Sequence, residues 1–128
     1  MIKAYLTGIP SLYEGEDIEV RYCIFEDEVL LSKETIMIAY EKPALVGQVS
    51  LLILLEKLQP YLGKEINIIV NDTTLHEIIK GTSRTKNQEV TTMAIETREQ
   101  LSKLNHPTIL DVSGDHKQLV IWHENLKP

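Results

Sequence analysis

Residues 65–74 read EINIIVNDTT, and this stretch decides the fold. Its apolar part, residues 66–70, is nearly continuous and β-branched, which is typical of a strand buried on both faces in a partly parallel sheet. The run stops at Asn71-Asp72, and residues 74–80 follow with the apolar spacing of a short helix. A carboxylate at the end of a buried strand can be a catalytic acid, a metal ligand or the cap of the next helix.

Strand-like and helical segments continue outward from this stretch. Upstream, segments rich in β-branched and aromatic residues predict strands at residues 2–6, 18–25 and 29–40. Before residue 65, a helix over residues 44–58 is predicted by apolar side chains at positions 45, 46, 49, 52, 53 and 55. Downstream, the same criteria predict a helix, a strand and a last helix at residues 89–104, 108–112 and 116–126.

This order of elements predicts a single α/β domain over residues 1–128. A helix that crosses over a sheet between two strands normally joins parallel strands. We therefore expect a mixed five-stranded sheet, three antiparallel strands followed by two parallel ones, with helices packed on its faces. A chain of 128 residues with 43% hydrophobic and 25% charged residues is typical of one globular domain with one core.

The cysteine and hydropathy patterns predict where the protein resides. Cys23 is the only cysteine, so it forms neither an internal disulfide nor a thiolate metal site, and we expect a buried thiol that fills core space. This usage fits a reducing compartment, and we expect a cytoplasmic protein. The N-terminal MIKAYLTG does not have the pattern of a signal peptide, and the longest apolar run, residues 49–55, is far shorter than the roughly 20 residues of a membrane span.

The charge pattern bears on nucleic-acid binding. The net charge is −6, so the overall field does not attract nucleic acid, and binding would need a local basic patch. Residues 80–87, KGTSRTKN, form the one basic stretch without an acid, and Lys80, Arg84 and Lys86 are the candidate phosphate contacts. The alternative is an ordinary solvated connector.

Asp72 also has a structural interpretation. An aspartate before a helical run is a strong N-cap, because its carboxylate accepts hydrogen bonds from free backbone N–H groups. Thr74 with Glu77 three residues later fits a capping box as well. We favour a capping role for this segment over a chemical one.

Three segments together resemble the ribonuclease H-like fold over nearly the whole chain. Residues 66–81, INIIVNDTTLHEIIKG, look like its fourth strand, terminal aspartate and following helix. Residues 46–58, VGQVSLLILLEKL, look like its first helix, and residues 111–126, DVSGDHKQLVIWHENL, like its fifth strand, glycine-histidine loop and closing helix. Active members are nucleases in which acids at four positions hold divalent metals, as the resemblance implies.

At three of these four positions this sequence differs from that pattern. Thr7 stands where the first strand would end in an aspartate, and Asp72 matches the fourth-strand aspartate. Gln48, or Gly47 if the register slips by one, stands where the first helix would carry a glutamate. Neither a threonine, a glycine nor a glutamine carries the charge that two divalent cations require of their ligands.

On the last helix the matching residue is His123, with Glu124 beside it. Asp72, His123 and Glu124 are thus the candidate ligands of a one-metal site, because they offer two oxygens and one nitrogen. Asp72 and Glu124 are the candidate catalytic residues if the chain is an enzyme. Such an enzyme would be a weak nuclease or phosphoryl-transfer enzyme that depends on Mg²⁺ or Mn²⁺.

These observations favour a catalytically degenerate ribonuclease H-like domain. We expect a binding or interaction module, with nucleic acid as a candidate partner, no cofactor and no membrane contact. The first alternative is the metal-dependent nuclease built around Asp72. The second is a self-associating or protein-interaction domain that uses a sheet edge and has no nucleic-acid role. The oligomeric state stays open.

Overall fold

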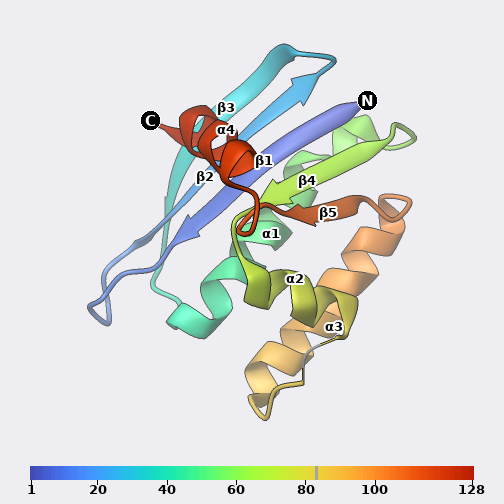
Figure 1. Ribbon diagram of the computed structural model, residues 1–128. Coiled ribbons are helices and arrows are strands. Elements are labelled where there is room, and N and C mark those ends of the chain that lie inside the picture. The colour runs from blue at the N-terminus through green and yellow to red at the C-terminus, as the bar shows by residue number, and fades with distance from the viewer. Residues whose placement is uncertain (83) are drawn as a thin grey trace.

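A mixed five-stranded sheet forms the centre of the structure, a computed structural model that describes residues 1–82 and 84–128 (Figure 1). The strand order is β3-β2-β1-β4-β5. The first three strands pair antiparallel, and β4 and β5 add parallel to β1. This confirms the expected mixed sheet. The strands are β1 Ile2–Ile9, β2 Ile18–Glu26, β3 Val29–Ile38, β4 Ile66–Val70 and β5 Thr108–Asp111.

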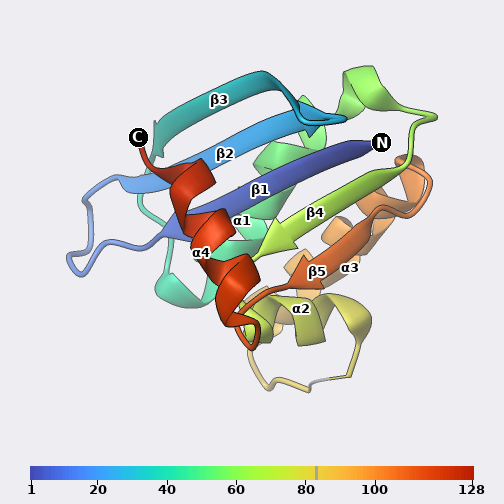
Figure 2. The same ribbon diagram turned by 45° about the horizontal axis from the view of Figure 1, so that its top comes forward.

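Helices cover the two faces of the sheet unequally. One face carries α1 and α3, whereas α4 alone crosses the other (Figure 2). The short α2 lies beyond the end of β4, beside β5. The helices are α1 Pro43–Lys57, α2 Thr73–Lys80, α3 Gln88–Lys103 and α4 His116–Leu126, with a 3₁₀ turn at Gln59–Tyr61. None of the helices in the described residues is long and apolar enough to cross a membrane.

The larger core lies between the sheet and α1. Alternate residues of β1, β2 and β4 point to this face, as strand geometry requires. They meet Leu51, Leu54 and Leu55 of α1 and Leu58, the residue after it, all at most 1% exposed. Leu101 of α3 and Leu104, the residue after that helix, also belong to the cluster. The apolar pattern of residues 66–70 therefore reflects a strand that contributes to two cores.

The smaller core lies under α4. It consists of Tyr5, Cys23, Ile69, Val112 and Leu126, with Phe25, Leu119 and Trp122 packed against it. Cys23 is fully buried, and burial raises the pKa of its thiol to about 11. The expectation of a thiol that fills core space is thus confirmed, because a neutral buried thiol is a poor nucleophile.

Local differences from the predicted elements have simple causes. The capping-box interpretation of Thr74 is wrong, because α2 starts one residue earlier, at Thr73, and Asp72 is its cap. The third strand contains a bulge, since Ile24 pairs with Ser32 while Phe25 pairs with Leu30, which leaves Leu31 unmatched. A bulge of this kind bends a strand and disturbs its edge.

Leu54 offers a test of the larger core. It is fully buried in α1, so Leu54→Ala removes apolar contacts and leaves a cavity. We expect the free energy of unfolding, measured in urea, to fall by about 2–5 kcal/mol. The matched control is Ile95→Ala on α3, where the side chain is 60% exposed and a change within about 0.5 kcal/mol is expected. Equal effects of the two substitutions would contradict the assigned core.

Candidate functional site at the carboxyl ends of β1 and β4

The carboxyl ends of the two central parallel strands lie side by side. Leu6 of β1 pairs with Val70, the last residue of β4, and β1 continues beside β2 as far as Ile9. In open α/β sheets this edge is where ligands usually bind. A small cavity of about 40 Å³ lies here, lined by Leu6, Thr7, Gly8, Gly47, Ser50, Val70, Asn71, Asp72 and Leu75.

Asp72 caps α2. Its backbone is extended, and its Oδ1 accepts a hydrogen bond of 2.9 Å from the N–H of Leu75. A carboxylate in this place satisfies a free backbone donor and interacts favourably with the helix dipole. The capping role that the sequence favoured is therefore present. The second oxygen, Oδ2, faces α1.

Gly47 is the residue of α1 that faces Asp72. A Cβ atom at Gly47 would lie 2.8 Å from Oδ2 of Asp72, closer than side-chain atoms normally approach. Gln48 points elsewhere, because it is only 2% exposed and its Nε2 donates a hydrogen bond of 3.1 Å to the carbonyl of Val90 in α3. The register left open by the sequence is thus the one with Gly47 at the site. The helix brings no side chain to Asp72 at this position.

The tryptophan of the last helix, Trp122 of α4, points toward β1, one of the two strands that form the site. Trp122 is half-buried, and its indole N–H donates a hydrogen bond of 3.0 Å to the carbonyl of Leu6 in β1. His123 and Glu124, the next two residues along the helix, are exposed. Glu124 forms an ion pair of 3.0 Å with Lys127, the residue that follows the helix.

The predicted metal ligands do not form a cluster. Within residues 1–82 and 84–128, no three His, Cys, Asp or Glu side chains come together in a group that could hold a metal ion. Asp72, His123 and Glu124 therefore do not form the predicted group of three ligands. The physical reason is the rotation of α4, since consecutive helix residues are about 100° apart and Trp122 occupies the side that faces the sheet.

Asp111 holds the end of β5 to the start of α2. Its Oδ1 accepts hydrogen bonds from the backbone N–H groups of Asp72 and Ser113, at 3.2 and 3.1 Å, and its Oδ2 accepts one of 3.0 Å from the Thr73 hydroxyl. Burial alone would raise the pKa of Asp111, but the hydrogen bonds from Ser113, Thr73 and Asp72 outweigh it and hold that pKa below its ordinary value. Sequence reasoning did not select this aspartate as a site residue. Asp115 itself caps α4.

The candidate phosphate contacts lie away from the small cavity. Lys80 is the last residue of α2, and Arg84 and Lys86 follow in the connection to α3. All three are exposed, and none forms an ion pair within the part of the chain that the structure describes. Lys80 and His76 also line a groove of about 480 Å³ between α2, α3 and β5.

Sequence comparisons find no match, whereas comparison with solved structures finds similar folds. No protein-family model matches the chain, and no curated protein matches it. One similar structure is that of LC11 ribonuclease H1, a protein isolated from compost by metagenomics, in complex with an RNA/DNA hybrid. It has a TM-score of 0.79 and 12% identity over 98% of this chain and 94% of that one. Ribonuclease H1 of the archaeon Halobacterium salinarum NRC-1 has a TM-score of 0.77 and 15% identity over 87% and 84%.

A third structure, the N-terminal ribonuclease H domain of a Mycobacterium tuberculosis protein, has a TM-score of 0.73 and 10% identity over 87% of this chain and 86% of that one. At such identities the likeness concerns the fold. The chain therefore has the ribonuclease H fold, which confirms the resemblance seen in the sequence.

A double-mutant cycle tests the contact between Gly47 and Asp72. Gly47→Ala gains helix propensity of about 1 kcal/mol but places a methyl group against Oδ2 of Asp72. In the protein with Asp72 present, we expect the close approach of this methyl group to Oδ2 to cancel the gain in stability. In an Asp72→Ser background, where the shorter cap still accepts a backbone hydrogen bond, Gly47→Ala should stabilise the protein by about 1 kcal/mol in urea unfolding. Equal effects in both backgrounds would contradict the contact.

Asp111 predicts a pH dependence of stability. Because its pKa is lowered in the folded protein, its contribution is present above the ordinary aspartate range and is lost as the pH falls through the lower folded pKa. Asp111→Asn should therefore destabilise the protein at pH 7, and the difference from wild type should shrink below about pH 4. Thermal unfolding of both proteins from pH 7 to pH 3 measures this. If the difference in thermal midpoint between the two proteins stays constant with pH, the negative charge of Asp111 has no role in stability.

Proposed function

We propose that this protein is a non-catalytic domain of the ribonuclease H fold that works as a binding module for nucleic acid. The observation that carries the proposal is the contact of Asp72 with Gly47. Asp72 is the only carboxylate among the residues that line the cavity at the strand ends, and the helix that faces it presents a glycine.

The chemistry of phosphodiester hydrolysis with metals supports a loss of catalysis. Two divalent cations must be held by several oxygen ligands while they stabilise the attacking and leaving groups. Here one oxygen of Asp72 caps α2, and both oxygens of Asp111 accept hydrogen bonds from the surrounding chain. The carboxylates at this edge hold the fold together, so we infer that no Mg²⁺ or Mn²⁺ is required.

The support for nucleic acid as the ligand is the fold together with the exposed basic residues. The structurally similar LC11 ribonuclease H1 is seen with an RNA/DNA hybrid. In this chain Lys80, Arg84 and Lys86 are exposed and carry no ion-pair partner among the described residues. Because the net charge is −6, binding through these side chains is weak and strongly dependent on salt.

A self-associating domain is the second candidate, and the edge strand β3 is the observation that favours it. Val29, Leu30 and Met37 of this strand are 63%, 49% and 54% exposed. Lys33 and Glu34 in its middle, with the bulge beside them, are features that discourage pairing with another edge. Nucleic-acid binding is therefore the function to test first.

The test combines binding and cleavage of a labelled RNA/DNA hybrid. At low salt we expect binding by fluorescence anisotropy and no cleavage with Mg²⁺ or Mn²⁺, for wild type and Asp72→Asn alike. Changing Lys80, Arg84 and Lys86 to Gln should weaken binding and reduce the slope of log affinity against log salt by up to roughly 0.9 per lost contact. The matched control changes Lys33, Lys103 and Lys117 to Gln, which alters the net charge equally.

Two outcomes would contradict the proposal. Cleavage that is lost in Asp72→Asn would establish the metal-dependent nuclease instead. Absence of hybrid binding at low salt, or equal weakening by the two triple variants, would remove the basic stretch as the interface. Light scattering then decides whether the second candidate, self-association, holds.

A further inference from the structure

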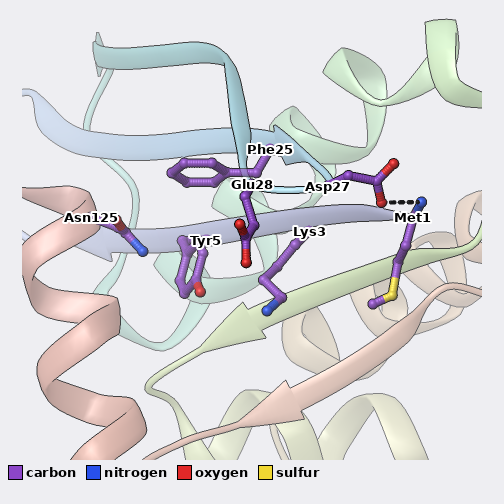
Figure 3. Close-up of a pocket in the computed structure, with 7 residues that line it drawn as sticks. All are labelled: Met1, Lys3, Tyr5, Phe25, Asp27, Glu28 and Asn125. Carbon is purple, nitrogen blue, oxygen red and sulfur yellow. Dashed lines mark hydrogen bonds and ion pairs between the residues drawn. The ribbon is translucent and has the colours of Figure 1, made fainter.

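A second cavity lies on the other face of the sheet, at the opposite end of β1 from Asp72. It has a volume of about 290 Å³ and opens between the last turn of α4 and the β2–β3 hairpin (Figure 3). No residue lines both this cavity and the small one at the strand ends. The side chains that matter here are Lys3, Tyr5, Phe25, Asp27, Glu28 and Asn125.

The inner wall of this cavity is aromatic. Tyr5 of β1 and Phe25 of β2 pack edge to face, with ring centroids 6.0 Å apart and an angle of 84° between the rings. Burial raises the pKa of Tyr5, so its phenol stays neutral at physiological pH. The wall is therefore an uncharged surface against which an apolar group can pack.

The rim of the cavity carries charges of both signs. Lys3 projects from β1, and Asp27 and Glu28 project from the hairpin turn. Asp27 already has a partner, because its Oδ1 lies 3.2 Å from the amino group of Met1. Lys3 and Glu28 point toward the same space, yet within the described residues neither forms an ion pair with the other or with a third group (Figure 3).

The turn that carries Glu28 is strained. Asp27 and Glu28 have φ angles of 47° and 79°, in the left-handed region that favours glycine. A two-residue hairpin turn of this kind usually has Asn-Gly or Asp-Gly, so a glutamate in the second position costs stability. Backbone strain of this sort is often retained where the side chain has a function. Here the strained residue places a carboxylate at the mouth of the cavity.

We propose that this cavity binds a free α-amino acid with an apolar side chain, its carboxylate at Lys3, its ammonium group at Glu28 and its side chain against Tyr5 and Phe25. Because Asp27 is already paired with the amino group of Met1, the charges left at the rim are Glu28, which would repel a simple anion, and Lys3, which would repel a simple cation. A ligand that carries one positive and one negative charge complements both Glu28 and Lys3 at the rim. A volume of about 290 Å³ lies at the small end of ligand pockets, which fits a single amino acid.

The first experiment is titration of the full chain with L-leucine and with L-phenylalanine, followed by NMR and calorimetry. We expect saturable binding at concentrations up to about ten millimolar. Isopentylamine and N-acetyl-L-leucine each lack one charge of leucine, and both should bind roughly tenfold more weakly or worse. Absence of saturable binding, or equal binding of the N-acetyl analogue, would overturn the proposal.

Substitutions of Lys3 and Glu28 test where the two charged groups of the amino acid bind. Glu28→Gln and Lys3→Gln should each weaken binding roughly tenfold, whereas Glu14→Gln and Lys117→Gln, which alter exposed charges elsewhere, should leave it unchanged. Glu28→Gly should raise the thermal midpoint by roughly 3–6 °C because the strain is removed, while binding is lost. Unchanged affinity in both Glu28→Gln and Lys3→Gln would overturn the proposal, whatever the hybrid-binding result.

Discussion

The close packing of α1 against the ends of β1 and β4 is the constraint on which the rest of this structure depends. Two glycines permit it. A Cβ at Gly8 would lie 2.2 Å from the hydroxyl oxygen of Ser50, and one at Gly47 would lie 2.8 Å from Asp72. Because the helix sits this close, the space between Asp72 and α1 is only about 40 Å³. The same closeness that completes the core leaves little room for ligands around Asp72.

The two faces of the sheet then serve different purposes. The face under α1 and α3 is buried continuously and supplies most of the apolar contacts. The face under α4 is covered by one helix, so part of it stays open beside Tyr5 and Phe25. Stability therefore comes chiefly from the larger core on the fully covered face, which leaves the face under α4 freer to vary.

Much of the fold could be predicted from the sequence because the element types have clear signals. The continuous β-branched run of residues 66–70 identified the central strand, and the aspartate after it identified the helix cap. The rotation of α1 could not be predicted, because apolar residues occur all around this helix. Val49 is only partly buried, while Gln48 is buried, contrary to what the apolar spacing suggests. A helix that is apolar on every side does not indicate which neighbour faces the sheet.

The site was predicted less completely, for a related reason. Asp72 was found from its local context, but two partners of Asp111, Asp72 and Thr73, lie in a segment that is distant from it in sequence. Among the described residues His123 and Glu124 do not join Asp72 in a metal-binding group, and this depends on the direction in which Trp122 points. Such contacts depend on packing between elements, and the periodicity of one segment does not contain that information.

Trp122 has a consequence for how unfolding of this protein is observed. It is the only tryptophan in the chain, and its indole is anchored under α4 by the carbonyl of Leu6. Its emission therefore reports the docking of one helix on the thinly covered face, whereas circular dichroism reports all helices and strands. Coincidence of the two optical transitions would mean that α4 separates only when the whole domain melts. An earlier fluorescence change would identify α4 as an independently opening unit.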